Sequence, residues 1–160
     1  MAKYLILVLL NLLISACQNQ NIVSQKYDPI ISNIFIDVVE KKSNINKFTD
    51  SKNSSEFLKL LRNWIDNDVK TIGFNGILNI NLISISTAEI LIDDGVRIQT
   101  EIEIDFLITK TILEKKRLIQ FKGKEFAEIT GDFSLNDKKI EIDNISKRLI
   151  HRLSNKLSQE

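Results

Sequence analysis

The sequence predicts an α+β fold in which two helices pack on one face of a four-stranded mixed sheet, in the order β-α-β-β-β-α. Residues 98–108 alternate between apolar and polar side chains, which is typical of a strand with one buried and one solvated face. Residues 53–69 and 138–157 instead repeat their apolar side chains at helical spacing. A sheet with one wet face is antiparallel or mixed and carries its helices on the other face.

The first strand and helix come from residues 34–69. Residues 34–39 are apolar and β-branched, which predicts a strand, and a polar loop follows from residue 43 to 53. The helix begins near Asn53, because Glu56 three residues later suits a capping box. Its expected buried face carries Phe57, Leu58, Leu60, Leu61, Trp64, Ile65 and Val69. A right-handed crossover would make the first two strands parallel.

Three more strands and a long helix complete the predicted domain. Residues 77–86 alternate with a change of phase at Leu82–Ile83 that suggests a bulge, and Asp93-Asp94-Gly95 predicts a turn. Residues 98–112 and 118–129 then pair as a hairpin. The last helix presents a stripe that can dock on the sheet, made of Ile142, Ile145, Leu149, Ile150, Leu153 and Leu157.

The N-terminus has the features of a secretion signal. An apolar run at residues 4–14 follows Lys3 and is too short to cross a membrane, and small residues lead into Cys17, the only cysteine. Ile14-Ser15-Ala16-Cys17 resembles the lipobox of bacterial lipoproteins. This resemblance implies cleavage before Cys17 and lipidation of its sulfur. The alternative is an ordinary cleavable signal followed by a chance cysteine.

The lipobox sets the expected domain organisation. Residues 1–16 are the signal peptide, residues 17–33 are the lipidated cysteine and a tether, and residues 34–160 form a single α+β domain. Many lipoproteins retained in the inner membrane carry Asp after the cysteine, whereas this chain has Gln18. The resemblance therefore favours the outer membrane, with the domain anchored on the periplasmic side. An acylated Cys17 also leaves no thiol for a disulfide.

Composition argues against several classes of function. The chain has 22 basic and 21 acidic residues, so a nucleic-acid partner has no electrostatic support. The only histidine, His151, is expected on the exposed side of the last helix, and no nucleophile elbow or phosphate loop is present. Glu101, Glu103 and Asp105 could bind a cation, but alternation alone places them on a solvated face. We therefore expect no enzyme, metal site or cofactor.

The order of elements behind a lipobox resembles the LPS-assembly lipoproteins of the LptE family, in their alphaproteobacterial form. The matching segments are residues 61–66 (LRNWID), residues 77–85, residues 94–97 (DGVR), residues 106–108 with the turn to residue 118, and residues 145–153 (ISKRLIHRL). The resemblance implies a lipoprotein that plugs an outer-membrane β-barrel of the LptD type and helps to export lipopolysaccharide to the cell surface.

Cations at the expected hairpin are candidate lipopolysaccharide contacts. Lys115, Lys116 and Arg117 lie in the turn, and Lys122 and Lys124 follow on the next strand. Phosphates are good partners for such clustered cations. The alternative is an ordinary charged turn. The runner-up function is an accessory or binding lipoprotein of another envelope or lipid-transport machine, which would share the fold and the anchor.

Overall fold

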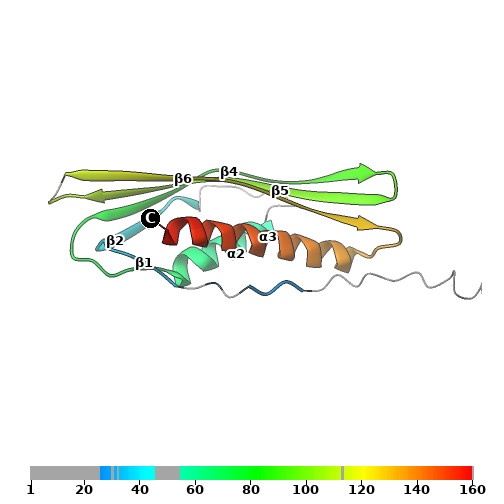
Figure 1. Cartoon of the computed structure of the whole chain (residues 1–160), viewed down its shortest axis with the longest axis horizontal. Coiled ribbons are helices and arrows are strands. Elements are labelled where there is room, and N and C mark those ends of the chain that lie inside the picture. Colours follow the sequence, from blue (N-terminus) through cyan, green and yellow to red (C-terminus); the bar gives the residue numbers. More distant parts are fainter. Residues whose placement is uncertain (1–25, 30, 32, 46–54, 113, 160) are drawn as a thin grey trace, which may run out of the picture.

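The protein is an elongated two-layer α+β structure. The computed structural model describes residues 26–29, 31, 33–45, 55–112 and 114–159. Its elements are β1 (Ile34–Ile36), β2 (Glu40–Ser43), α2 (Ser55–Asn67), β3 (Val69–Thr71), β4 (Ile77–Ile92), β5 (Gly95–Lys110), β6 (Lys115–Thr130) and α3 (Leu135–Ser158). Figure 1 shows both helices on one face of a sheet with strand order β2-β4-β5-β6. The predicted fold class is confirmed.

The predicted first strand is wrong in its extent, because the chain divides it between two sheets. β1 pairs in parallel with β3 as a separate two-stranded sheet, and β2 pairs in parallel with the start of β4. The chain changes sheets around Val38, which is fully buried. Gly73 allows this crossing, because a Cβ there would lie 2.6 Å from the backbone nitrogen of Val38. The expected parallel pairing therefore exists, but the charged segment of β2 makes it.

The long strands β4, β5 and β6 form an antiparallel meander. β4 pairs with β5 from Ile77 opposite Thr109 to Ile92 opposite Gly95. The register shifts between Leu82 and Ser84, where the sequence predicts a bulge. Gly95 sits in the predicted turn with φ +151°, and a Cβ there would lie 1.9 Å from the carbonyl oxygen of Ile129. Glycine is therefore required for β5 to start beside the end of β6.

The core lies between the inner face of this sheet and the two helices. Val96, Ile98, Thr100, Ile102, Ile104 and Phe106 of β5 are all buried. The predicted apolar faces of both helices meet them, although Leu60 and Ile142 are only partly buried and Val69 begins β3 instead of extending the helix. Trp64 of α2 packs edge-on against Phe106, with ring centroids 6.4 Å apart. Helical and strand periodicity therefore identified the buried faces correctly.

α3 begins with a capping box that lies before the predicted start of the helix. The Ser134 hydroxyl accepts a hydrogen bond from the Asp137 amide, and the Asp137 carboxylate accepts one from the Ser134 amide. These hydrogen bonds from Ser134 lower the pKa of Asp137 below its ordinary value of 3.8. The interaction therefore stabilises the fold above pH 3.8 and is lost as the pH falls through the lowered pKa.

Replacing Ser134 with alanine should destabilise the protein by about 1 kcal/mol, because the first turn of α3 loses a side-chain acceptor. Urea unfolding at pH 7, followed by far-UV circular dichroism, measures the loss. Ser158→Ala at the other end of α3 is the matched control and should change the midpoint little. An unchanged midpoint for Ser134→Ala would show that the cap contributes nothing.

The segment before β1 is bound along α3 (Figure 1). The Tyr27 amide donates to Asn144 Oδ1 at 2.7 Å, and Lys147 Nζ lies 3.4 Å from Asp28 and 3.0 Å from Asp143. Burial alone would lower the pKa of Lys147, but its hydrogen bonds to Asp143 and Asp28 raise it overall. The described end of the expected tether is therefore part of the folded structure.

Candidate functional site

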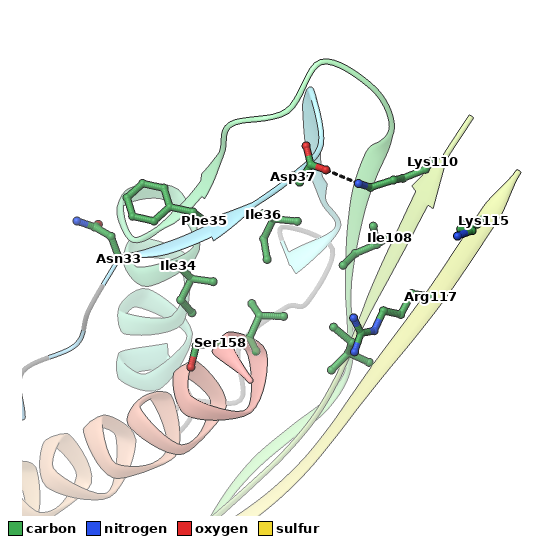
Figure 2. A pocket seen from close by; sticks show the side chains of 12 residues that line it. Asn33, Ile34, Phe35, Ile36, Asp37, Ile108, Lys110, Lys115, Arg117 and Ser158 are labelled. Atoms are coloured by element: carbon green, nitrogen blue, oxygen red, sulfur yellow. Dashed lines mark hydrogen bonds and ion pairs between the residues drawn. The ribbon is translucent and has the colours of Figure 1, made fainter. Parts of the chain in front are cut away.

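A cavity of about 600 Å³ lies where the β5–β6 hairpin meets β1 and the end of α3 (Figure 2). Its apolar lining comes from four elements and consists of Ile34, Phe35, Ile36, Ile108, Ile119 and Leu157. Its polar lining consists of Asn33, Asp37, Lys110, Lys115, Arg117 and Ser158. We call this cavity the basic pocket, because three cations and one carboxylate line it.

Strand alternation explains how cations and isoleucines come to share this pocket. Lys115, Arg117 and Ile119 are alternate residues of β6, so their side chains point to the helix-covered face of the sheet. Across the hairpin, register places Lys110 opposite Lys115 and Ile108 opposite Arg117. In Figure 2 Lys110, Arg117 and Lys115 follow one wall of the pocket, with Ile108 among them.

One carboxylate partly balances this positive wall. Asp37, from the crossing between β1 and β2, forms an ion pair with Lys110. The Lys110 side chain is 29% exposed and that of Asp37 is 70% exposed, so water screens the pair. The lining therefore combines two kinds of group, because ammonium and guanidinium groups suit phosphate while isoleucine and leucine side chains suit hydrocarbon.

The structure divides the five predicted contact residues between opposite faces of the sheet. Lys115 and Arg117 line the basic pocket, whereas Lys122 and Lys124 point to the solvated face. Lys116 occupies an even-numbered position like these last two and is exposed. The parity of position along β6 was the sequence signal that could have separated the two groups. Lys110 was not predicted, although it lies directly across the hairpin from Lys115.

Two of the three carboxylates expected on the solvated face are matched by cations of β6, whereas the third, Asp105, accepts a hydrogen bond from the Gln120 side chain at 3.3 Å. Glu103 lies 2.8 Å from Lys122, and Glu101 lies 3.1 Å from Lys124. The hydrogen bond to Glu103, with the attraction of its charge, raises the pKa of Lys122. Within the described residues no three of His, Cys, Asp and Glu gather as metal ligands. The geometry of this face is therefore that of a ladder of exposed ion pairs.

Two further sequence predictions concern His151 and Cys17. His151 was expected to be exposed but is partly buried, and its ring nitrogen Nε2 lies 3.2 Å from Asn155 Nδ2 on the next turn of α3. Cys17 lies outside the described residues. Across the described ranges, no helix is both long and apolar enough to span a bilayer.

Exposed apolar side chains adjoin the basic pocket. Phe35, which lines the pocket, is 60% exposed, and Ile72 and Phe74 after β3 are 61% and 99% exposed. Phe35 and Ile72 belong to the same parallel ribbon, since the Ile72 amide donates to the carbonyl oxygen of Ile36. Exposed aromatic and aliphatic side chains on neighbouring segments are typical of an interaction surface.

Comparisons with known proteins give only distant structural similarities. No protein-family model and no curated protein matches the sequence. A minor lipoprotein from Acinetobacter baumannii superposes with a TM-score of 0.40 at 10% identity, covering 82% of this chain and 91% of that one. The rare lipoprotein B from Shewanella oneidensis gives a TM-score of 0.41 at 13% identity, covering 76% and 92%.

A hypothetical protein from Chlamydia trachomatis gives a TM-score of 0.42 at 6% identity, covering 81% of this chain and 100% of that one. At similarities this distant, the proposal for function rests on the residues of this chain.

Proposed function

We propose that this chain is an outer-membrane lipoprotein, acylated at Cys17, that assembles with and plugs a β-barrel translocon of the LptD type exporting lipopolysaccharide. The observation that carries the proposal is the basic pocket. Lipopolysaccharide combines phosphates with acyl chains, and the pocket combines Lys110, Lys115 and Arg117 with an apolar lining. The lipobox at residues 14–17 supports the location.

The exposed apolar residues beside the pocket support a protein partner at the same end of the molecule. Phe35 belongs both to the pocket lining and to the exposed group with Ile72 and Phe74. A partner that covered this group would remove its apolar surface from water. Each Å² buried in this way contributes about 25 cal/mol to the stability of the complex. We therefore place the barrel contact at the pocket end, so that ligand and partner meet on one surface.

Replacing both Lys115 and Arg117 with serine should weaken lipopolysaccharide binding at least tenfold. Each charge-assisted hydrogen bond contributes about 1.5–3 kcal/mol, and about 1.4 kcal/mol corresponds to a factor of ten. Binding of purified lipopolysaccharide to the lipidated protein in detergent, measured by surface plasmon resonance, gives the affinities.

The matched control changes the same number of cations on the opposite face of the same strand. Lys122→Ser with Lys124→Ser removes two charges from the solvated face and should leave binding within about twofold, because neither residue lines the pocket. Equal losses in the two double variants would indicate a general effect of charge. Such a result would contradict the assignment of the basic pocket as the lipopolysaccharide-binding site.

A second function is supported by the same cavity, because its chemistry also suits phospholipids. In this alternative the chain is an accessory or binding lipoprotein of another envelope or lipid-transport machine. Copurification of the tagged protein from solubilised envelopes separates the two. A large outer-membrane barrel in the complex supports the translocon, whereas an inner-membrane transporter without a barrel supports the alternative.

A further inference from the structure

The two edges of the four-stranded sheet differ in how they are protected. On the β6 edge, Arg148 and Arg152 of α3 donate to the carbonyl oxygens of Phe126 and Lys124, at 3.4 and 3.2 Å. Glu125 holds both arginines, with Arg152 at 2.6 Å and Arg148 at 3.6 Å. A helix therefore occupies carbonyl groups that another strand would need, which is one of the ways in which proteins prevent edge-to-edge pairing.

Among the described residues, the devices on the β4 edge are its bulge and the inward-pointing Glu89. β2 pairs only with Ile77–Ile80, and Asn44 extends the contact to the amide of Leu82. No described residue pairs with the outer side of residues 84–92. This stretch (SISTAEILI) contains neither Lys, Arg nor Pro, and its one carboxylate, Glu89, lies 2.6 Å from Lys138. This stretch also carries Leu91, which is 88% exposed.

Sheet register shows which backbone groups of this edge are available. The Lys124 carbonyl receives Arg152, so it points away from β5, and its partner Glu101 therefore points its backbone groups toward β4. Glu101 lies opposite Ser86, so Ser86 is bonded to β5 and its neighbour Thr87 faces outward. By the same alternation, the outward-facing backbone groups are those of Ile85, Thr87, Glu89 and Leu91.

We propose that two copies of the chain pair with each other through residues 84–92 before either copy binds another partner. The two strands run antiparallel and are related by a two-fold axis at Ala88. This register uses all of residues 84–92, the part of the edge with which no described residue pairs. It places Thr87 opposite Glu89 and Ile85 opposite Leu91, so that outward-facing backbone groups meet each other. No carboxylate lies directly opposite another, and the exposed Leu91 gains an apolar partner.

The two-fold position itself fits this geometry. Ala88 points its backbone groups toward β5, so Ala88 and its copy form a non-hydrogen-bonded pair, in which side chains approach most closely, with Cα atoms about 4.5 Å apart. Alanine is small enough for that contact. The inference stands apart from the proposed function, because residues 84–92 adjoin the β4–β5 turn whereas the basic pocket adjoins the β5–β6 turn.

Cysteine crosslinking of the full-length, membrane-anchored protein tests the pairing. After mild oxidation, Ala88→Cys should run as a disulfide-linked dimer in more than half of the molecules, because Cα atoms at that separation suit a disulfide. Lys122→Cys, exposed on the other edge strand, is the matched control and should stay monomeric. The unsubstituted protein gives the background from Cys17.

Two further variants test the register and the contact. Ser86→Cys and Ile90→Cys should crosslink when coexpressed, while Ser86→Cys alone should not. Adding Leu91→Lys to Ala88→Cys should reduce the dimer at least fivefold, and this exposed position leaves folding intact. Sedimentation of the unsubstituted protein in detergent should give a dimer mass. A monomer mass, an Ala88→Cys that does not dimerise, or a crosslink to a different protein would overturn the proposal.

Discussion

Replacing Cys17 with serine should move the protein completely from the membrane fraction to the soluble fraction. Each buried CH₂ of an acyl chain contributes about 0.8 kcal/mol, and the lipobox resemblance implies several acyl chains on this one cysteine. No other residue type can carry this thioether. Fractionation of envelopes, with Gln20→Ser as the control substitution, measures the redistribution.

Mass spectrometry of the unsubstituted protein provides the complementary evidence. The expected N-terminal residue is an acylated Cys17, with residues 1–16 removed. A free thiol at Cys17, or a mature chain that still carries its leader, would contradict the anchor and with it the outer-membrane location.

Replacing Trp64 with alanine should destabilise the domain by about 3–5 kcal/mol, because the cavity would open at the centre of the core. Trp64 is 2% exposed and packs edge-on against Phe106. Urea unfolding should be followed by far-UV circular dichroism, since Trp64 is the only tryptophan and its fluorescence disappears with it.

The same position offers a second, sharper comparison. Trp64 Nε1 is buried with no hydrogen-bond partner among the described residues. Trp64→Phe removes this unsatisfied donor while keeping an aromatic ring, so it should cost much less than Trp64→Ala. Leu118→Ala, on the solvated face, should stay within about 0.5 kcal/mol. Equal losses for the two Trp64 variants would mean that the ring contact with Phe106 contributes little.

Sequence patterns predicted the long elements because each of those elements has one buried face. In β5 the alternation of isoleucines with carboxylates follows the burial of every second side chain, from Ile98 to Phe106. β2 and β3 escaped prediction because they are only 4 and 3 residues long. The sequence suggests that Lys41 of β2 is a surface cation, yet its ammonium donates to the carbonyl oxygens of Ile65 in α2 and Val69 in β3.

The candidate site was predictable only in part, for a related reason. Lys115 and Arg117 belong to a cluster of consecutive cations that is visible in the sequence itself. Asp37, by contrast, reaches the pocket through the crossing between two sheets. That placement depends on contacts between distant parts of the chain, and no local pattern around Asp37 indicates it.

The attachment of Tyr27 and Asp28 to α3 has a mechanical consequence for an acylated protein. Lateral drag on the lipid would be delivered to Asn144 and Lys147, in the middle of a 24-residue helix, before any force reached β1. The nine residue steps from Cys17 to Lys26 span at most about 30 Å. In an acylated protein the folded domain would therefore stay close to the bilayer, with the middle of α3 as its point of attachment.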